Sequence, residues 1–291
     1  MNQTNGSAAA YEIQGVCFRY GSPAKGGEPL LKHVTFTIGE GEIVGILGPN
    51  GSGKTTLLKI LAHLLVPQSG RVLVFGRELH GMSRRDIAKT VALVPQDAAP
   101  VFPFSIAEIV LMGRFPHQRD QRRFGWESAH DWDVVQQAME AMDVAHLRDR
   151  LMTDVSGGER QRAIIARALA QEPRVLLLDE PTVFLDLRHQ VDLMQRLQRL
   201  NAEQRLTIAV VSHDINLVSQ VCDRIVVMHQ GRLVREGPPE EVIRPELFEL
   251  VYGCHVSVDT HPHSGRPQVS VSFTEERTRS SFISTYYRGG G

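Results

Sequence analysis

The fold is decided by the residues Gly48-Pro49-Asn50-Gly51-Ser52-Gly53-Lys54-Thr55, which fit the pattern Gly-x-x-x-x-Gly-Lys-Ser/Thr. They follow an apolar run at 43–47 and open a helical pattern at 55–65. The glycines let the backbone curl so that N–H groups face phosphate oxygens, and the helix N-terminus adds positive potential there. Lys54 supplies a cation for the β and γ phosphates, and the Thr55 hydroxyl suits Mg²⁺. Together with Thr56, the stretch predicts a nucleotide-binding loop of the kind that many nucleoside triphosphatases share.

Two carboxylates, Asp179 and Glu180, end an apolar run at residues 175–178. Buried parallel strands have this composition, and ligands gather at their carboxyl ends. One carboxylate is needed to hold Mg²⁺, and a second to orient and deprotonate the attacking water. Because the sequence also contains a phosphate loop, a catalytic role for the two carboxylates is favoured over an ordinary solvated strand end. We therefore expect Asp179 to be a metal ligand and Glu180 the catalytic base.

Strands and helices alternate along most of the chain. The pattern predicts strands at residues 16–20, 34–38, 43–47, 71–75, 91–94, 175–178, 208–211 and 225–229. It predicts helices at residues 55–65, 105–112, 133–142, 158–170, 187–200 and 215–221. Such alternation indicates an α/β fold with a mostly parallel sheet covered on both faces, and a helical insertion at about residues 100–170. Strand signals weaken from about residue 255, and the last residues are expected to form a tail.

Composition narrows the possible classes of protein. The 291 residues are 42% hydrophobic and 22% charged, with a formal net charge of -1, so a global attraction to nucleic acid or anionic lipid is not indicated. The three cysteines are far apart and odd in number, which predicts no disulfide framework. The N-terminus lacks a signal-peptide pattern, and no apolar run approaches the ~20 residues that cross a bilayer. If the protein works at a membrane, another component is expected to hold it there.

A second glycine-rich stretch, Val155-Ser156-Gly157-Gly158-Glu159, precedes an apolar helix. Ser156 offers a hydroxyl, and the two glycines leave backbone N–H groups open at a helix N-terminus, which again suits an anion. With this stretch, residues 11–250 resemble the ATP-binding subunits of ABC transporters, because six motifs of that family occur here in family order. Val155 and Glu159 differ from the leucine and glutamine that are usual in this motif.

The resemblance implies roles for four further residues. Gln96 is similar to the family's glutamine loop, which supplies a neutral ligand for Mg²⁺ or for the attacking water. His213 is similar to the switch histidine that contacts the γ-phosphate, and Asp186 to the aspartate loop at the dimer interface. Tyr20 is similar to the aromatic residue that stacks on adenine.

The resemblance also implies how the ATP site is completed. In this family two subunits pack head to tail, so that Ser156, Gly157 and Gly158 of one copy would complete the site of the other. It implies a P-loop NTPase core with an N-terminal antiparallel β subdomain and an inserted helical subdomain. We expect an ABC ATPase domain at residues 11–254, between a flexible N-terminus at 1–10 and a C-terminal extension and tail at 255–291.

Three further stretches are similar to importers of iron-siderophore, haem and cobalamin compounds: Met112-Gly113-Arg114-Phe115-Pro116-His117, Leu185-Asp186-Leu187-Arg188-His189-Gln190 and His261-Pro262-His263-Ser264-Gly265-Arg266-Pro267. This implies a peripheral ATPase at the cytoplasmic face of the cell membrane. Its partners would be a second copy of itself, two permease subunits and, indirectly, a substrate-binding protein. An ATPase of another importer class and a soluble ABC ATPase without a transport role remain alternatives.

Two weaker patterns have plainer explanations. Arg114, Arg119, Arg122 and Arg123 interleave with Phe115, Phe124 and Trp126, as in some proteins that bind single-stranded nucleic acid. A solvated loop or a surface facing a partner protein is favoured, and no nucleic acid is expected as a partner. His261 and His263 have no cysteine or acidic residue at metal-binding spacing, so a loop is favoured over a metal site.

Overall fold

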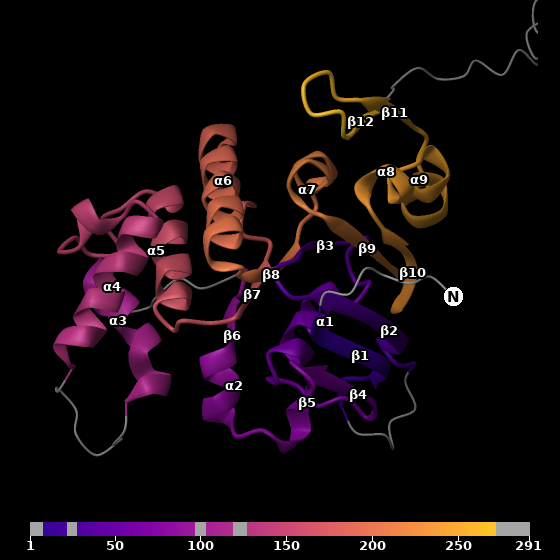
Figure 1. Ribbon diagram of the computed structural model, residues 1–291. Coiled ribbons are helices and arrows are strands. Elements are labelled where there is room, and N and C mark those ends of the chain that lie inside the picture. The colour runs from indigo at the N-terminus through magenta and orange to yellow at the C-terminus, as the bar shows by residue number, and fades with distance from the viewer. Residues whose placement is uncertain (1–7, 22–27, 97–102, 119–126, 272–291) are drawn as a thin grey trace, which may run out of the picture.

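The computed structural model describes residues 8–21, 28–96, 103–118 and 127–271 of the chain. Within them lie a six-stranded sheet of order β10-β9-β3-β8-β7-β6, a four-stranded sheet of order β2-β1-β4-β5 and a two-stranded sheet, β11-β12 (Figure 1). Helices cover the six-stranded sheet on both faces. The predicted α/β class, with a mostly parallel sheet and a separate antiparallel one, is confirmed.

The central sheet has five parallel strands: β3 (Ile43–Leu47), β6 (Val91–Val94), β7 (Val175–Asp179), β8 (Thr207–Val211) and β9 (Arg224–His229). At one edge β10 (Arg232–Gly237) pairs antiparallel with β9. Runs of Val, Ile and Leu let the parallel strands bury both faces, and every residue of β3, β7 and β8 is buried. Because these strands run in one direction, the segments that follow β3, β6, β7 and β8 meet at one edge of the sheet.

The antiparallel sheet consists of β1 (Ala9–Phe18), β2 (Leu31–Gly39), β4 (Ser69–Val74) and β5 (Arg77–Glu78). Its apolar face shares a core with helix α1 (Lys54–Leu61) and with one face of the central sheet. The hydroxyl of Tyr11 on β1 donates a hydrogen bond to the carbonyl oxygen of Leu61 at 2.7 Å. This sheet therefore supports the helix that follows the phosphate loop.

A layer of helices lies beside β6: α3 (Ile106–Leu111), the 3-10 helix η3 (Met112–His117), α4 (Ala129–Ala141) and α5 (Gly157–Leu169) (Figure 1). Each of the three α-helices begins with a capping box, in which a serine and an acidic residue three positions later bond each other's backbone N–H groups. Their buried faces join the core on the other side of the central sheet. These helices occupy the segment in which the helical insertion is predicted.

The remaining helices pack on the same core or lie at the rim. Helices α6 (Leu187–Gln204) and α7 (Ile215–Val221) cover the face of the central sheet opposite α1. The short elements are α2 (Arg84–Thr90), α8 (Pro239–Val242), α9 (Pro245–Tyr252), η2 (Leu79–Gly81) and η4 (Ala145–Leu147).

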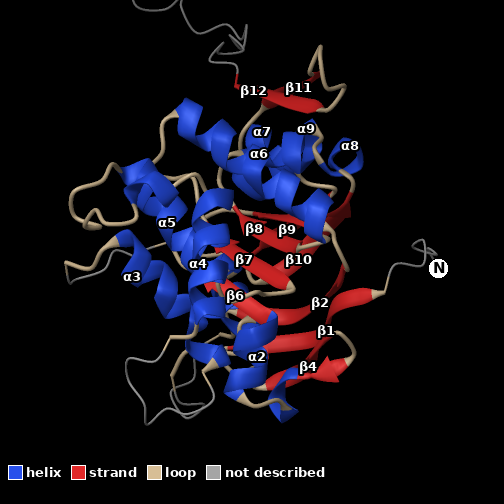
Figure 2. Ribbon diagram, turned by 60° about the vertical axis from the view of Figure 1, so that its left-hand side comes forward, coloured by secondary structure: helices blue, strands red, loops and turns tan. Residues whose placement is uncertain are grey.

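Beyond α9, the strands β11 (Val256–Thr260) and β12 (Pro267–Val271) form a hairpin (Figure 2). It docks on α7, where the side-chain amide of Asn216 exchanges two hydrogen bonds with the backbone of Val269, at 3.0 and 2.7 Å. Arg266 Nη1 donates to the carbonyl oxygens of Ser219 and Cys222 at the end of α7, at 3.0 and 2.5 Å. These contacts with α7 thus hold in place two strands that have only a weak strand pattern in their own sequence.

Most predicted elements are found with ends shifted by a few residues. Strand β1 begins at Ala9, inside the stretch expected to be mobile, whereas residues 1–7 and the tail at 272–291 lie outside the described residues. Strands β5 and β10–β12 and helices α2, α8 and α9 have no counterpart in the sequence prediction. No helix of the described residues is long and apolar enough to span a membrane.

Candidate functional site

The phosphate loop joins β3 to α1, and its glycines are required by close packing. Gly48 has φ +147°, and a Cβ there would lie 2.1 Å from the carbonyl oxygen of Met228. Gly53 has φ +101° and caps α1, where a Cβ would lie 2.4 Å from Leu31 Cδ2. Neither position accommodates a side chain, so the loop backbone keeps a shape that only glycine allows. The part of the loop most open to solvent consists of Pro49, Asn50 and Gly51.

Two buried polar side chains line this loop. Lys54 is 6% exposed, and its Nζ donates to the carbonyl oxygens of Gly48 and Pro49 at 2.8 and 3.0 Å. Burial lowers the pKa of Lys54 and outweighs the attraction of Glu180 and Asp179. The Oγ of Ser52 is buried without a hydrogen-bond partner among the described residues. A buried hydroxyl without a partner is costly, and a phosphate oxygen is a partner of the right kind.

Oxygen atoms of Thr55 and Asp179 lie together at the end of β7. Thr55 Oγ1 donates to Asp179 Oδ1 at 3.1 Å. Asp179 is 3% exposed, and this burial raises its pKa against the opposing effects of the Thr55 hydrogen bond and of the nearby side chains of Lys59, Lys54 and His213. A hydroxyl and a carboxylate oxygen side by side are the hard ligands that Mg²⁺ prefers. The residues present therefore fit a magnesium ion next to the phosphate loop.

Glu180 is held in a specific position at the site. Its backbone has φ +51°, a left-handed conformation uncommon for residues other than glycine, and its N–H donates to the carbonyl oxygen of Val211 at 2.9 Å. Its Oε1 lies 2.5 Å from His213 Nε2, which follows β8. The Glu180 side chain is 8% exposed and the His213 side chain 42%. A left-handed backbone conformation at a residue other than glycine is often found at functional sites.

Tyr20, the residue predicted to stack on adenine, lies beside the phosphate loop. Its hydroxyl is 3.2 Å from Thr56 Oγ1, which belongs to the first turn of α1. The ring is 55% exposed and meets the ring of Phe18 edge-on at 4.9 Å between centroids. The Tyr20 ring thus packs against Phe18 near the loop, while much of the residue is open to solvent.

The second glycine-rich stretch forms the exposed start of α5. Ser156 is the N-cap, and its Oγ accepts from the N–H of Glu159 at 3.3 Å. Ser156 and Gly157 are exposed, whereas Gly158 is buried against His189, whose Cδ2 would lie 2.9 Å from a Cβ at that position. The stretch is therefore presented outward.

Asp186 caps α6 next to this stretch. Its Oδ1 accepts from the N–H of His189 at 2.9 Å and lies 2.8 Å from His189 Nδ1. Hydrogen bonds from the His189 backbone and side chain hold the pKa of Asp186 below its usual value. Sequence reasoning did not assign a role to His189, although it lies in a stretch that resembles the importers. Its contacts with both Gly158 and Asp186 link the start of α5 to the start of α6.

Gln96, Gly157 and Glu180 line one pocket of about 250 Å³, together with Phe184. Gln96 follows β6 and is exposed, Glu180 follows β7, and Gly157 begins α5. Val183 and Phe184, which line the same pocket, are 44% and 76% exposed. The structure therefore brings the predicted glutamine loop next to the carboxylate of Glu180.

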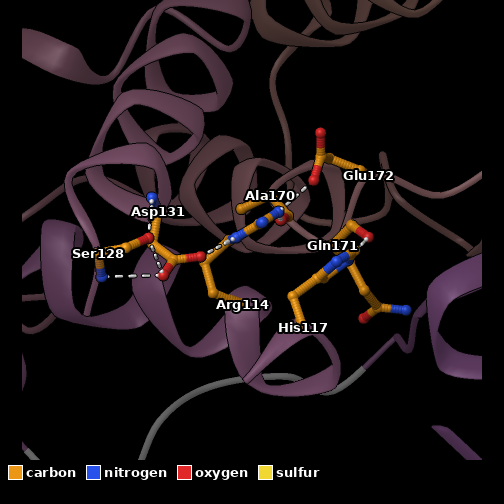
Figure 3. A network of polar contacts seen from close by, with 7 residues as sticks. All are labelled: Arg114, His117, Ser128, Asp131, Ala170, Gln171 and Glu172. Carbon is orange, nitrogen blue, oxygen red and sulfur yellow. Dashed lines mark hydrogen bonds and ion pairs between the residues drawn. The ribbon is translucent and has the colours of Figure 1, made fainter. Parts of the chain in front are cut away.

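The interpretation of Arg114 as part of a solvated loop or partner surface is wrong. Its side chain is 2% exposed and forms ion pairs with Asp131 and Glu172, which lie far from it in the sequence (Figure 3). Local composition could not reveal these partners. The neighbouring Phe115 is 57% exposed. The other residues of that pattern, Arg119, Arg122, Arg123, Phe124 and Trp126, lie outside the described residues.

His261 and His263 lie in the turn of the C-terminal hairpin. The turn is closed by His261 N–H, which donates to the carbonyl oxygen of Arg266 at 2.8 Å. Over the described part of the chain, no group of three His, Cys, Asp or Glu side chains is arranged to hold a metal ion.

Comparison with known proteins agrees with this geometry. Residues 31–183 match the ABC transporter family. The cobalamin import ATP-binding protein BtuD of Halobacterium salinarum is 40% identical over 267 residues, which are 91% of this chain and 65% of that protein. This chain thus spans less than two thirds of that relative. The ferric enterobactin transport ATP-binding protein FepC of Escherichia coli is 37% identical over 240 residues, 82% of this chain and 88% of that protein.

A solved structure of similar fold is that of a dimeric ATP-binding cassette in a post-hydrolysis state, bound to ADP and Pi. It has a TM-score of 0.68 and 30% identity, and the match covers 78% of this chain and 98% of that chain. The match to the family over residues 31–183, the similarity to FepC over most of its length and the shared fold lead to one conclusion. The chain belongs to the ABC transporter family.

Proposed function

We propose that this chain is the ATP-hydrolysing subunit of an importer that moves a metal chelate of the iron-siderophore, haem or cobalamin type through a separate permease. The observation that carries the enzymatic part is the Glu180–His213 pair, 2.5 Å apart, at the strand ends beside the phosphate loop. The transport part is supported by the two relatives, which are named for cobalamin import and ferric enterobactin transport.

Binding of the nucleotide is assigned to the phosphate loop, from Gly48 to Thr55, and to Thr56 and Tyr20. Lys54 is already desolvated and its ammonium group is aimed along the loop, so it is prepared to neutralise phosphate charge. The Ser52 hydroxyl, without a partner in the described residues, is available to a phosphate oxygen. The exposed ring of Tyr20 offers a surface for the adenine.

Thr55 and Asp179, with Gln96, are the proposed residues for Mg²⁺. Mg²⁺, when bound, would neutralise the charge that develops on the phosphate oxygens. Asp179 contributes a buried carboxylate, and Thr55 contributes a hydroxyl 3.1 Å from it. Gln96 lines the same pocket as Glu180 and adds an amide oxygen without adding charge.

Glu180 is the proposed general base. Its carboxylate is mostly buried, fixed by an unusual backbone conformation, and close enough to His213 for a hydrogen bond. A base held in this way accepts a proton from water with little reorganisation. His213 orients the carboxylate and, being 42% exposed, is also open to the γ-phosphate side.

The site is proposed to be shared between two copies of the chain. Ser156 and Gly157 are exposed at a helix N-terminus, where backbone N–H groups favour an anion. Asp186 and the exposed Phe184 lie beside them. A second copy, packed head to tail, would bring its phosphate loop to Ser156. ATP then favours the closed dimer because it binds that form better than the separate chains.

Coupling to transport is assigned to the helical insertion at about residues 100–170 and to the loop of Gln96. We place the ATPase domain at 11–254 and regard 255–291 as an extension. The partners would be two permease subunits at the cytoplasmic face of the cell membrane, with a substrate-binding protein acting on the permeases. The ATPase would reach the membrane only through the permeases, and the transported compound would never touch it.

The enzymatic part is tested with Glu180→Gln. We expect the variant to bind ATP with unchanged affinity and to lose at least 10²-fold in turnover, in line with the loss of a positioned general base. The matched control is Glu203→Gln, an exposed carboxylate at the end of α6 that should leave turnover unchanged. Near-normal turnover by Glu180→Gln would remove Glu180 from the role of base.

The transport part is tested by isolating tagged Glu180→Gln from membranes with and without ATP. A polytopic permease that co-purifies, and whose own cargo is a metal chelate, is the expected result. A soluble partner in place of a permease would leave the ATPase chemistry standing and contradict the importer. A permease for another class of compound would contradict the assignment of the cargo alone.

A further inference from the structure

Arg114 carries a positive charge into the interior of the helical layer, where it is 2% exposed. Its Nε donates to Asp131 Oδ1 at 2.8 Å, and its Nη1 donates to Glu172 Oε2 at 2.6 Å and to the carbonyl oxygen of Ala170 at 2.8 Å. Figure 3 shows the guanidinium between acceptors from two different helices. A buried charge is tolerated only when it is paired and hydrogen-bonded, so these acceptors fix its place.

Asp131 uses both of its carboxylate oxygens. Oδ2 accepts from the backbone N–H and the hydroxyl of Ser128, at 3.0 and 2.7 Å, and so caps α4, while Oδ1 accepts from Arg114. Burial acts to raise the pKa of Asp131, but the hydrogen bonds from Arg114 and Ser128 outweigh it and lower that pKa. The start of α4 is therefore bonded to η3 by an ionised carboxylate.

The same arginine meets α5 at the end opposite Ser156. The carbonyl oxygen of Ala170 belongs to the C-cap of α5, and a cation there suits the negative end of the helix dipole. Gly113 lies against the same turn, where a Cβ would be 2.1 Å from the carbonyl oxygen of Arg167. A charged bond and a close backbone contact together fix the last turn of α5 on η3.

The contacts continue from η3 and α5 into the nucleotide-binding core. His117 Nε2 lies 2.9 Å from the carbonyl oxygen of Gln171, just after α5 (Figure 3). The Gln171 side-chain amide donates to the carbonyl oxygens of Val91, at 2.9 Å, and of Ala88. Since Val91 begins the strand that leads to Gln96, the end of α5 is attached to the core beside the proposed catalytic site.

We propose that Arg114 is a positioning residue for Ser156: by fixing the last turn of α5, it sets where the first turn is presented to a second copy of the chain. This inference rests on the proposed function, in which Ser156 completes the ATP site of that copy. Because α5 has 13 residues and is about 20 Å long, a small tilt around its last turn produces its largest displacement at the first turn, where Ser156 lies. A misplacement of about 1 Å can cost about 10²-fold in rate.

The test uses Arg114→Lys in the full chain that also carries Glu180→Gln. Lysine keeps the charge but lacks the planar fork that binds Asp131 and Ala170 together. We expect the ATP concentration for half-maximal dimerisation to rise at least tenfold, measured by sedimentation velocity. The affinity of the single chain for a fluorescent ADP analogue should change less than twofold, because the network does not include the phosphate loop.

Two further variants complete the test. Asp131→Asn removes one acceptor charge while keeping its shape, and should weaken dimerisation in the same direction even if Arg114→Lys fails to fold. The control is Arg148→Lys, an arginine of the same helical layer that is 49% exposed and lies 3.7 Å from Asp149. This control should dimerise like the parent.

Dimerisation unchanged in both Arg114→Lys and Asp131→Asn would overturn the positioning role. An equal loss of ADP affinity would also overturn it, because the effect would then lie in the phosphate loop and not in Ser156. If the Glu180→Gln parent itself does not dimerise with ATP, the shared site falls and this inference falls with it. If the Glu180→Gln parent dimerises and the Arg114→Lys and Asp131→Asn variants dimerise equally well, only the positioning role of Arg114 is refuted.

Discussion

Replacing Asp179 by asparagine is expected to stabilise the nucleotide-free protein and to weaken its use of Mg²⁺. The carboxylate is 3% exposed, and among the described residues its side chain accepts a hydrogen bond from Thr55 at 3.1 Å. Burial raises its pKa, which means that the folded chain holds the charged form less well than the unfolded chain does. Asparagine keeps the shape and an acceptor for Thr55 while removing the charge.

The magnitude follows from this environment. Lys54, Lys59 and His213 offset part of the cost of burial, so the gain should be no larger than that of an ordinary stabilising substitution, about 0.5–2 kcal/mol. For a chain of this size about 1 kcal/mol raises Tm by about 2–4 °C. Against this, a ligand at about 100 times its Kd stabilises the parent by about 2.7 kcal/mol. The variant should lose the part of that gain that depends on Mg²⁺.

The sign of the pH dependence is fixed by the raised pKa. An acid with a raised pKa in the folded state destabilises it fully above that pKa, and the effect disappears as the pH falls below the ordinary value of 3.8. The advantage of Asp179→Asn should therefore be largest near neutral pH and shrink toward pH 4. Thermal unfolding of parent and variant, with and without Mg²⁺ and ATP, measures both effects. A variant no more stable than the parent without nucleotide, or one that keeps the full Mg²⁺-dependent gain, would refute the reasoning.

Substitutions at three further positions test the adenine platform, the shared ATP site and the C-terminal hairpin separately. Tyr20→Phe should bind ATP like the parent, whereas Tyr20→Ala should lose about tenfold or more in affinity, since stacking contributes about 1–3 kcal/mol per base. If both variants lose the same affinity in a fluorescence titration, the Tyr20 ring is not the platform for adenine. Glu159→Gln should lower the ATP concentration needed for dimerisation by about threefold, because it removes a negative charge beside Ser156. Hydrogen bonds from the Ser156 backbone and side chain lower the pKa of Glu159 and so keep its carboxylate ionised. No change in sedimentation would place Glu159 away from the nucleotide. Arg266→Ala should loosen the C-terminal hairpin on α7 and speed amide exchange in α7, whereas unchanged exchange would mean that Asn216 and Ser219 hold the hairpin without Arg266.

Local patterns predicted the elements that build the nucleotide site. The apolar run before Gly48 and the one before Asp179 are long enough to be recognised as buried strands, and β3 has the predicted ends. The residues that follow these strands lie at one edge of the sheet, because parallel strands have their carboxyl ends at the same edge. This is why Glu180 and His213, which follow two neighbouring strands, lie next to each other.

Contacts between distant segments could not be predicted in the same way. Arg114 lies in a stretch of mixed polar and aromatic residues, and only its bonds to Asp131 and Glu172 show that it is buried. The hairpin β11–β12 has short, largely polar strands, and it is held by Asn216, Ser219 and Arg266 across α7. Buried charges and docked hairpins depend on partners far along the chain, which periodicity does not report.

Sedimentation velocity of the Glu180→Gln chain, with and without Ser156→Arg, tests the shared ATP site most directly. The account predicts that Glu180→Gln forms a dimer when ATP is added, and that adding Ser156→Arg abolishes this dimer while the single chain still binds nucleotide. Lys54→Ala in the same background should lose both nucleotide binding and the dimer. A Ser156→Arg chain that dimerises at the same ATP concentration as its parent would contradict the claim that each copy completes the other's site.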